Sequence, residues 1–372
     1  MKIAIHQPRI SYYIGGGERV PLEQAKYLSK LGHLVTIVTI RPNKKSLLFK
    51  SFIKNNPLVK IEYFEPSNKL KQLYGIDLGQ NRYRCDAESL EFGHLTEKYY
   101  QRNIFDLVAA HYTVDVLKIP RNQNTILHLH GCPAHKRNID NRSLRRADNF
   151  ISVAKYVRDF WREMHHIEKP IFLAYNGVNN NYFRPIKIIK NYDLLFIGRL
   201  IKIKGVDDLL NAISLIVKKK QNLKTVIIGN GPEKEKLKFL AKKLKINQNI
   251  IWLDSITDVK LLQLYNSSKV SVFPSIAKEG VLTTMLEAAA CNSAIITANC
   301  CGMSEFLKNN QNGLLVEPRN PKLLASAIMR LLSNEDLVKK LGKNALIAVN
   351  KHWTWKKQAR KLELIYKLCL KK

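Results

Sequence analysis

The sequence has no long uninterrupted apolar run, and this predicts that it has no transmembrane helix. Its longest uncharged stretch runs from Ala288 to Ser304, where Asn292 and Asn299 interrupt it. It therefore falls short of the roughly 20 apolar residues that span a bilayer. The opening MKIAIHQPRI holds too short an apolar segment for a secretory signal peptide, so none is expected.

Cysteine is scarce and irregularly spaced. The chain of 372 residues has six cysteines and no CxxC pair, which excludes the usual zinc-ribbon spacing and a regular disulfide framework. A reducing, cytoplasmic environment is the natural expectation. The cysteines are Cys85, Cys132, Cys291, Cys300, Cys301 and Cys369.

Acidic residues are also few, with 30 Asp and Glu against 62 Lys and Arg, for a net charge of +32. Residues 1–184 carry 29 basic and 16 acidic side chains, and residues 185–372 carry 33 and 14, so the excess is not a basic tail. Such a charge favours a polyanionic partner: nucleic acid, an anionic membrane or nucleotide phosphates. No nucleic-acid motif is present, and the aromatic residues are not interleaved with basic ones on a recognisable surface, so specific nucleic-acid binding is the less favoured alternative.

The first half begins as a doubly wound α/β sheet would. A strand over 2–6 precedes a loop with Gly15, Gly16 and Gly17, a helix over 18–31 and a strand over 34–40. Ligands of such sheets bind at the carboxyl ends of the strands. Further strands are predicted over 103–111, 124–130 and 149–153, with a helix over 155–164.

A turn-rich segment, NGVNNNYFRPIKII over 176–189, marks the predicted domain boundary. Residues 1–184 form the first predicted domain and residues 185–352 the second, in which strands and helices alternate again. The end of the chain, 353–372, reads as a helix that packs its apolar stripe on the body of the protein. Second-domain strands are predicted over 193–197, 224–228, 250–253, 270–273 and 294–297, and helices over 206–219, 233–244, 258–266 and 281–290.

The segment Pro274 to Glu317 holds two acids, Glu279 and Glu287, where a loop runs into a helix predicted to start near Val281. The helix N-terminus beyond Gly280 would suit an anion. An ordinary βα unit with solvated glutamates is the alternative. On one continuous helix, eight residues would separate the acids by about 12 Å, which exceeds the roughly 5 to 9.5 Å of hydrolytic glycosidase pairs. The acids are therefore expected to bind two ends of one ligand.

A basic loop, GRLIKIKG, precedes the first helix of the second domain. Between Gly198 and Gly205 it carries Arg199 and Lys204, a guanidinium and an ammonium beside a helix start, as a diphosphate requires. A solvated basic loop is the alternative. The spacing is not that of the phosphate loop GxxxxGK[ST].

Glycines and a histidine complete the candidate residues. Gly229 and Gly231 allow either close approach of a nucleotide or a plain turn, and the three consecutive glycines after the first strand favour ligand approach. His130 ends a predicted strand and would project into the ligand crevice, whereas His128, on the same face, is expected to be structural.

In this order the motifs resemble the retaining glycosyltransferases of family 4, which have the two-domain GT-B architecture. The resemblance covers nearly the whole chain, and the ordered set is more specific than any one motif. The motifs are GGGERV, His130-Gly131, SVAKYVRDF, NGVNNNYFRP, GRLIKIKG, GNGPE, PSIAKEGVLTTMLEAAA, CGMSE and NGLLVEP.

The resemblance implies two Rossmann-like domains facing a central cleft, the first for the acceptor and the second for a nucleotide diphosphate sugar, with the final helix packed back on the first. It gives Arg199 and Lys204 to the diphosphate, Glu287 to the ribose and Glu279 to the transferred sugar. It also implies a position near the anomeric carbon for His130. The implied donor-binding set is Gly15, Gly16, Gly17, Gly198, Arg199, Lys204, Gly229, Gly231, Glu279, Gly280, Val281, Leu282 and Glu287.

The resemblance further implies a front-face reaction, in which the acceptor attacks from the side that the diphosphate leaves, without a cofactor or metal ion. The chain departs from the family where Val281-Leu282 follow Glu279-Gly280 in place of the frequent Phe-Gly, which leaves the donor sugar open. UDP- and GDP-sugars both remain candidates. A non-hydrolysing sugar-nucleotide epimerase of the same architecture is the alternative enzyme.

The acceptor side is indicated by NKKSLLFKSFIKNN over 43–56, which would form a basic amphipathic helix. This predicts either an anchor on anionic lipid or a helix packed on the core. An anchor would favour glycan or lipid-linked cell-envelope acceptors of the lipopolysaccharide, O-antigen or capsule type, at the inner face of the cytoplasmic membrane. The residues concerned are Leu48, Phe49, Lys50, Phe52 and Lys54.

Overall fold

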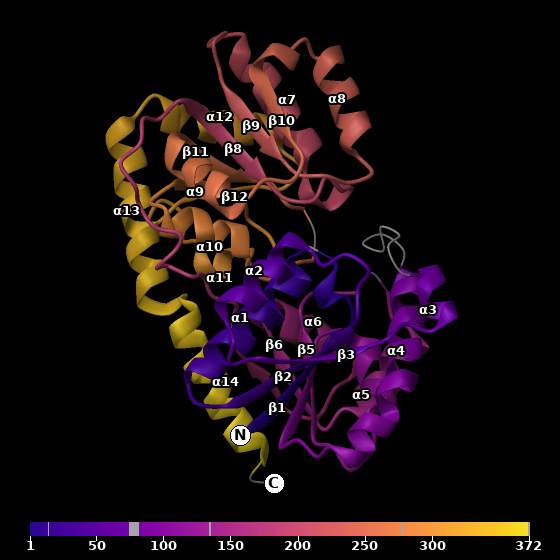
Figure 1. Ribbon diagram of the computed structural model, residues 1–372. Helices are drawn as coiled ribbons and strands as arrows, with labels where there is room; N and C mark the ends of the chain where they lie inside the picture. Colours follow the sequence, from indigo (N-terminus) through magenta and orange to yellow (C-terminus); the bar gives the residue numbers. More distant parts are fainter. Residues whose placement is uncertain (14, 74–81, 134, 277, 371–372) are drawn as a thin grey trace. The chain divides into compact units, whose positions relative to one another are not determined.

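The computed structural model describes residues 1–13, 15–73, 82–133, 135–276 and 278–370, and it divides into two compact units (Figure 1). The first unit comprises Met1–Tyr175 together with Trp355–Lys372, and the second comprises Asn176–Thr354. The chain therefore leaves the first unit after Tyr175 and returns to it at Trp355. Each unit is built around one parallel sheet.

The first unit contains a seven-stranded parallel sheet in the order β3-β2-β1-β4-β5-β6-β7. The strand order reverses between β1 and β4, so the loops after these strands diverge at a topological switch point. The strands are β1 (Lys2–His6), β2 (Leu34–Ile40), β3 (Lys60–Phe64), β4 (Leu107–Ala110), β5 (Thr125–Leu129), β6 (Asn149–Ser152) and β7 (Ile171–Leu173).

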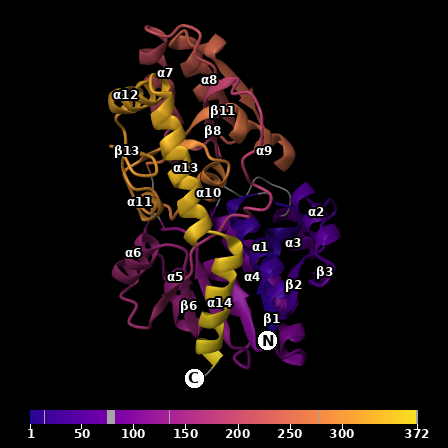
Figure 2. The same ribbon diagram turned by 90° about the vertical axis from the view of Figure 1, so that its left-hand side faces the viewer.

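Alternation along β1 sends neighbouring side chains to opposite faces of this sheet. Ile3 and Ile5 join a core with α1, α2 and α14, whereas Ala4 joins the core beneath α3, α4, α5 and α6. Helix α14 lies beside α1, as both ribbon views show (Figures 1 and 2). The helices are α1 (Gly16–Lys30), α2 (Leu47–Asn55), α3 (Asn68–Leu73), α4 (Arg82–Arg102), α5 (Asn138–Arg146), α6 (Lys155–His165) and α14 (Trp355–Leu370).

The second unit contains a six-stranded parallel sheet in the order β10-β9-β8-β11-β12-β13, with its switch point between β8 and β11. Its strands are β8 (Tyr192–Ile197), β9 (Thr225–Ile228), β10 (Ile250–Leu253), β11 (Ser268–Phe273), β12 (Ala294–Ala298) and β13 (Leu314–Val316). Its helices are α7 (Val206–Val217), α8 (Lys234–Lys243), α9 (Asp258–Ser267), α10 (Thr283–Ala290), α11 (Met303–Phe306), α12 (Pro321–Leu332) and α13 (Glu335–His352).

The predicted fold class, two doubly wound parallel-sheet domains, is confirmed. Several boundaries differ from the prediction. Strand β4 is four residues long where nine were predicted, and α10 begins at Thr283, after its N-cap Leu282, where a start near Val281 was predicted. None of the helices in the described ranges combines the length and apolarity needed to cross a bilayer.

Candidate functional site

The candidate donor site lies at the switch point of the second sheet, where the loops that follow β8 and β11 meet. The first loop carries Arg199 and Lys204, and the second carries Glu279. In open α/β sheets the ligand crevice lies outside the carboxyl ends of the strands at this point. The topology thus brings together residues that are 75 positions apart in sequence.

Backbone contacts hold the loops after β8, β9 and β11 together, and two glycines make these contacts possible. Gly229 has φ +152, and a Cβ there would lie 1.9 Å from the carbonyl oxygen of Gly198. Gly205 has φ +63, and a Cβ there would lie 2.1 Å from the carbonyl oxygen of Pro274. Both positions require glycine for conformation and for space. Gly229 and Gly205 therefore act through loop packing, whatever contact either makes with a ligand.

Lys204 and Glu279 form an ion pair at the centre of the site. The Lys204 ammonium donates to both carboxylate oxygens of Glu279 at 2.8 Å. The Lys204 side chain is 11% exposed and that of Glu279 20%. The two hydrogen bonds to the carboxylate hold the ammonium in place. Their attraction compensates much of the free energy that the ammonium loses when it is removed from water.

Glu279 is not on the helix that carries Glu287. Helix α10 begins four residues after Glu279, so the helical rise does not set the distance between the two acids and the condition behind the expected 12 Å separation is not met. The Glu279 segment is held by a backbone bond from the amide of Gly302 to the Glu279 carbonyl at 3.0 Å. A Cβ on Gly302 would lie 2.8 Å from Gly280. The CGMSE motif thus supports the loop that carries Glu279.

Glu287 lies on α10 and is 5% exposed. The Tyr265 hydroxyl of α9 donates to its carboxylate at 3.0 Å, and the structure adds Tyr265 to the residues that sequence patterns had indicated. No local pattern predicts this contact, since the two residues are 22 positions apart on different helices.

The remaining second-unit residues predicted for the donor site lie on the loops after β8, β9 and β11. Arg199 is exposed, Val281 is buried and Leu282 is partly exposed just before α10. Gly231 has φ +154, and a Cβ there would lie 2.4 Å from the Leu200 carbonyl oxygen, which again ties the GNGPE loop to the GRLIKIKG loop.

The glycine loop of the first unit forms the N-terminus of α1. Gly15 is the N-cap in an extended conformation, and Gly16 and Gly17 form the first helical positions. Both of these glycines are exposed, with no described atom within 4 Å of where a Cβ would stand. The first amides of α1 therefore have room for a ligand close to the backbone.

His130 follows β5 and belongs to a group of three stacked imidazoles. His130 Nε2 and His111 Nδ1 are 2.9 Å apart, and the His111 and His128 rings stack with centroids 4.4 Å apart. Burial lowers the pKa of His130 to about 4. Burial and the neighbouring imidazoles hold the pKa values of His111 and His128 well below 6.5. All three rings are therefore neutral at pH 7.

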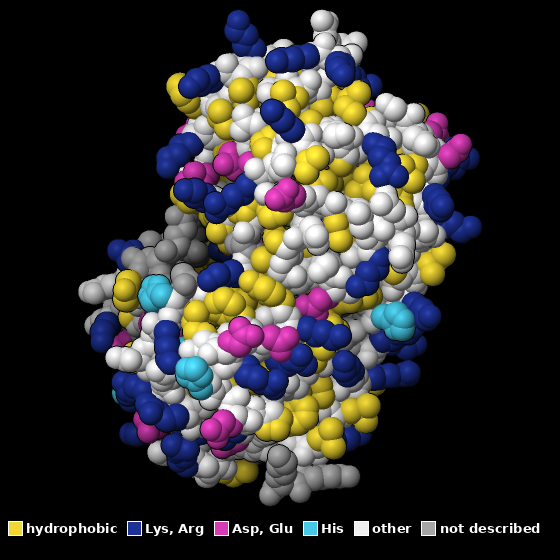
Figure 3. All heavy atoms as spheres, turned by 180° about the vertical axis from the view of Figure 1, so that it is seen from behind, with side chains coloured by type: hydrophobic (Ala, Val, Ile, Leu, Met, Phe, Trp, Pro, Cys, Tyr) yellow, Lys and Arg dark blue, Asp and Glu magenta, His cyan; other side chains and the backbone are white. Residues whose placement is uncertain are grey.

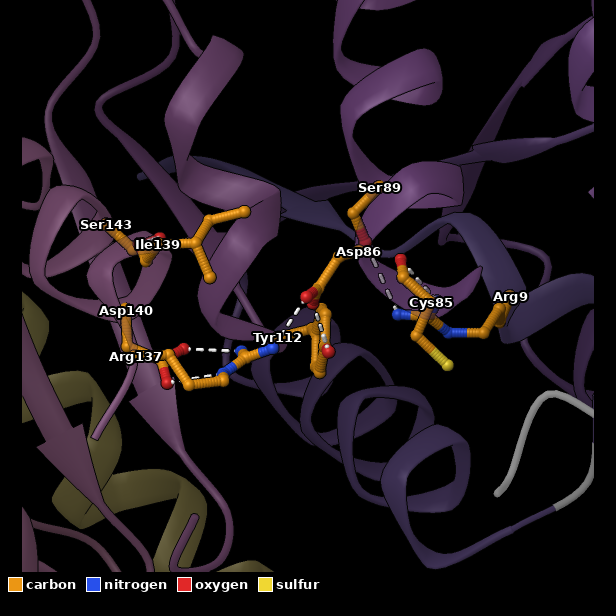
Figure 4. A network of polar contacts seen from close by, with 9 residues as sticks. All are labelled: Arg9, Cys85, Asp86, Ser89, Tyr112, Arg137, Ile139, Asp140 and Ser143. Carbon is orange, nitrogen blue, oxygen red and sulfur yellow. Dashed lines mark hydrogen bonds and ion pairs between the residues drawn. The ribbon is translucent and has the colours of Figure 1, made fainter. Parts of the chain in front are cut away.

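A polar network not predicted from the sequence joins α4 to the loops after β1, β4 and β5 (Figure 4). Arg9 donates to Glu88 at 2.6 Å, and both side chains are buried. Arg137 donates to Asp86 at 2.6 Å and to Asp140 at 2.7 Å. Arg9 and Glu88 are 79 positions apart in sequence, and Arg137 and Asp86 are 51 apart. No local sequence pattern could therefore predict these two ion pairs. The network fixes the loops at the carboxyl edge of the first sheet.

Asp115 lies close to this network and is fully buried. Burial raises the pKa of Asp115 to about 7, while the charge of Arg9 opposes the shift. Burial by itself would lower the pKa of Arg9. The neighbouring Glu88 and Asp115 outweigh this effect and raise the pKa of Arg9 above its ordinary value. Arg9 is therefore a permanently charged group inside the first unit.

Of the two predictions for residues 43–56, the structure supports the helix packed on the core. Phe49 and Phe52 are 0% and 7% exposed and belong to the core of the first unit, so they cannot insert into lipid. Leu48 is also packed against that core. Helix α2 is amphipathic: it buries its aromatic side chains in the core of the first unit and leaves its lysines exposed to solvent. Lys50, Lys54 and Leu47 remain exposed, and Figure 3 shows Lys and Arg scattered over one face of the molecule.

Two family models match the chain in succession. The model described as Glycosyltransferase Family 4 matches residues 14–182, and the one described as Glycosyl transferases group 1 matches residues 179–347. The chain therefore belongs to the glycosyltransferases of the family 4 and group 1 type, as its motifs predicted. Its two parallel-sheet units are those of the GT-B architecture.

Relatives of the chain carry the same description. It is 25% identical over 335 residues to an uncharacterised glycosyltransferase of Haemophilus influenzae, covering 87% of this chain and 88% of that protein. It is 26% identical over 231 residues to one of Methanocaldococcus jannaschii, covering 60% of this chain and 59% of that protein. The capsular polysaccharide biosynthesis glycosyltransferase CapM of Staphylococcus aureus is 28% identical over 186 residues, with coverage of 49% and 47%.

Solved structures share the fold at low identity. Sucrose-phosphate synthase from Thermosynechococcus elongatus superposes with a TM-score of 0.84 at 19% identity, covering 98% of both chains. The Anabaena protein HepE, solved in complex with UDP-glucose, superposes with a TM-score of 0.78 at 16% identity, covering 99% of both chains. These similarities support the fold.

Proposed function

We propose that this glycosyltransferase is a retaining enzyme that transfers a hexose-type sugar from a UDP- or GDP-sugar to a glycan or lipid-linked acceptor of the cell envelope. The observation that carries the proposal is the Lys204–Glu279 pair at the switch point of the second sheet. The ammonium is fixed where a diphosphate would bind, and the carboxylate lies beside it for the hydroxyls of a sugar. HepE with UDP-glucose supports a nucleotide-sugar donor, and CapM supports an envelope acceptor.

The proposed chemistry follows from the number of N–H groups on the Lys204 ammonium. An ammonium has three N–H donors, and Lys204 directs two of them to Glu279. The third is available to a diphosphate oxygen, where it would stabilise the charge of the leaving group together with Arg199. The acceptor hydroxyl would attack on the face that the diphosphate leaves and pass its proton to a phosphate oxygen. This route uses positioning and fixed charge, without a metal ion or cofactor.

The test is a panel of UDP- and GDP-sugars, offered first without an acceptor and then with lipid-linked and glycan acceptors. Release of free nucleotide that increases with acceptor, with the sugar recovered on that acceptor in the α or β configuration of the donor, would support the proposal. Conversion of the sugar nucleotide alone into a different sugar nucleotide would contradict it and identify an epimerase.

Tyr265 provides a prediction on the proposed ribose site. The Tyr265→Phe variant should bind UDP or GDP about 5- to 10-fold more weakly, because Glu287 loses a buried hydrogen bond of about 1 kcal/mol that orients it. Calorimetric titration of the nucleotide measures this change. Tyr192→Phe, at the start of β8, is the control and should bind as the original protein does. If the Tyr265→Phe variant binds the nucleotide as tightly as the Tyr192→Phe control does, the proposed role of Glu287 in the ribose site is contradicted.

We further propose a peripheral position on the inner face of the cytoplasmic membrane, with contact through the exposed side of α2. A variant with Leu47→Ser, Lys50→Gln and Lys54→Gln should co-sediment with anionic vesicles several-fold less than the original protein, because each surface lysine contributes about 1 kcal/mol of attraction. The variant Lys218→Gln with Lys219→Gln removes two exposed charges from the second unit as a control. If both variants sediment like the original protein, α2 is not the contact.

A further inference from the structure

Three histidines gather at the carboxyl edge of the first sheet, within one unit of the fold. His128 is on β5, His130 directly follows that strand, and His111 directly follows β4, the neighbouring strand. One nitrogen from each ring can be chosen so that the three nitrogens all lie within 4.8 Å of one another. The pairing of β4 with β5 is enough to bring these three residues together.

The geometry is close to that of a three-histidine metal site. A Zn–N bond of about 2.0 to 2.1 Å places tetrahedral ligand nitrogens roughly 3.3 Å apart. The nitrogens of His111 and His130 are 2.9 Å apart, and the third ring is within 4.8 Å. To bind one ion, His111 and His130 would exchange the hydrogen bond between them for bonds to the metal, and the stacked rings would turn until three lone pairs converge.

The hydrogen bonds of the cluster leave donor nitrogens without a protein partner. His111 Nε2 and His128 Nδ1 are buried and make no hydrogen bond to any described residue. A buried imidazole nitrogen without a partner loses its hydration and gains no hydrogen bond in return, which is unfavourable. Of the two, His128 Nδ1 is the independent sign that the cluster is suited to a ligand, because the nitrogen of His111 that approaches His130 is Nδ1 and not the unpartnered Nε2.

His128 also has the outer contact that metal-binding histidines use. Its Nε2 is 3.0 Å from the Tyr366 hydroxyl of α14. With the Nε2 proton donated to that hydroxyl, Nδ1 presents its lone pair, and a fixed tautomer of this kind is typical of a histidine ligand. Imidazole binds metal in its neutral form.

We propose that His111, His128 and His130 bind one divalent transition-metal ion of the zinc class. The donor set selects the metal: three imidazoles suit Zn²⁺, Co²⁺, Ni²⁺ or Cu²⁺, whereas Mg²⁺ and Ca²⁺ prefer carboxylate and carbonyl oxygens. His130 is partly exposed, so the ion enters from its side and keeps one position for water. The proposed transfer step does not use this ion, because its charge stabilisation comes from Lys204 and Arg199.

The test uses the full-length protein with no affinity tag, freed of metal with a chelator, and two probes, Zn²⁺ and Co²⁺. Calorimetry should give one equivalent of Zn²⁺ per chain, and Co²⁺ should produce visible absorption bands of tetrahedral cobalt. His111→Asn and His130→Asn should each weaken Zn²⁺ binding at least about tenfold. His94→Asn changes an exposed histidine on α4 and should bind like the original protein.

Circular dichroism shows whether each variant folds. If the His111→Asn chain is unfolded, His130→Asn alone decides, because its ring is the most exposed of the three. Stoichiometric binding that is lost with His130 and kept in the His94 control supports the site. Absence of one-to-one binding in the original protein, or unchanged binding in the folded His130→Asn protein, overturns the proposal.

Discussion

The Lys204→Ala variant is expected to turn over about 100-fold or more slowly than the original protein while keeping its fold. The ammonium of Lys204 is held by Glu279 at 2.8 Å, at the point where the donor diphosphate is proposed to leave. Its removal takes away a fixed positive charge, which no other group on the loop replaces in the same place. Nucleotide release from the best donor of the sugar panel, measured at saturating donor, gives the decrease in kcat.

Lys202→Ala is the matched control, because Lys202 is on the same loop, carries the same charge and is exposed. It should retain kcat within about twofold. Arg199→Ala is expected to lose turnover as well, because Arg199 is proposed to contact the same diphosphate. Normal turnover in both the Lys204 and Arg199 variants would exclude the assignment of this loop to the donor, whatever the behaviour of the control.

Gly229→Ala is expected to destabilise the second unit by about 3 kcal/mol or more. The added Cβ would lie 1.9 Å from the carbonyl oxygen of Gly198, and φ of +152 is a conformation that side-chain-bearing residues rarely adopt. Two backbone segments would have to separate, and the hydrogen bond from the Gly198 amide to the Ile228 carbonyl would weaken. Denaturant unfolding, followed by tryptophan fluorescence, to which Trp252 and Trp353 of the second unit contribute, measures the loss.

Gly17→Ala provides the comparison for the same chemical change. Gly17 is in the first turn of α1, with no described atom within 4 Å of the added carbon. Alanine should leave stability unchanged or raise it by up to about 1 kcal/mol, because glycine is a poorer helix former. An equal effect at both positions would mean that loop packing does not require glycine at 229.

The fold was largely readable from the sequence because strand and helix periodicities alternate clearly. Strand β1 was predicted with its observed bounds, and so was β2, since both are short apolar runs bounded by polar residues. The 21-residue helix α4 was not predicted: its buried side is formed partly by Glu88, Ser89 and other polar residues, so its apolar periodicity is weak.

The candidate site was readable only in part. Motifs indicated Lys204 and Glu279 separately, but spacing could not show that they pair, because the distance between two loops depends on strand order. Tyr265 and the Arg9 network have no local signature for the same reason. For α2 the pattern was ambiguous, since an aromatic stripe suits a core as well as a bilayer, and the adjacent sheet decided it.

The return of α14 to the first unit imposes an order on synthesis. Leu362, Ile365 and Tyr366 complete the same core as Ile3 and Ile5 but leave the ribosome only after the whole second unit. The second unit can therefore complete its core first, while the face of the first sheet that α14 covers is still open. During that interval a chaperone that binds exposed apolar strands would find its target on the earlier-made unit, and a nascent chain arrested before residue 355 would keep it.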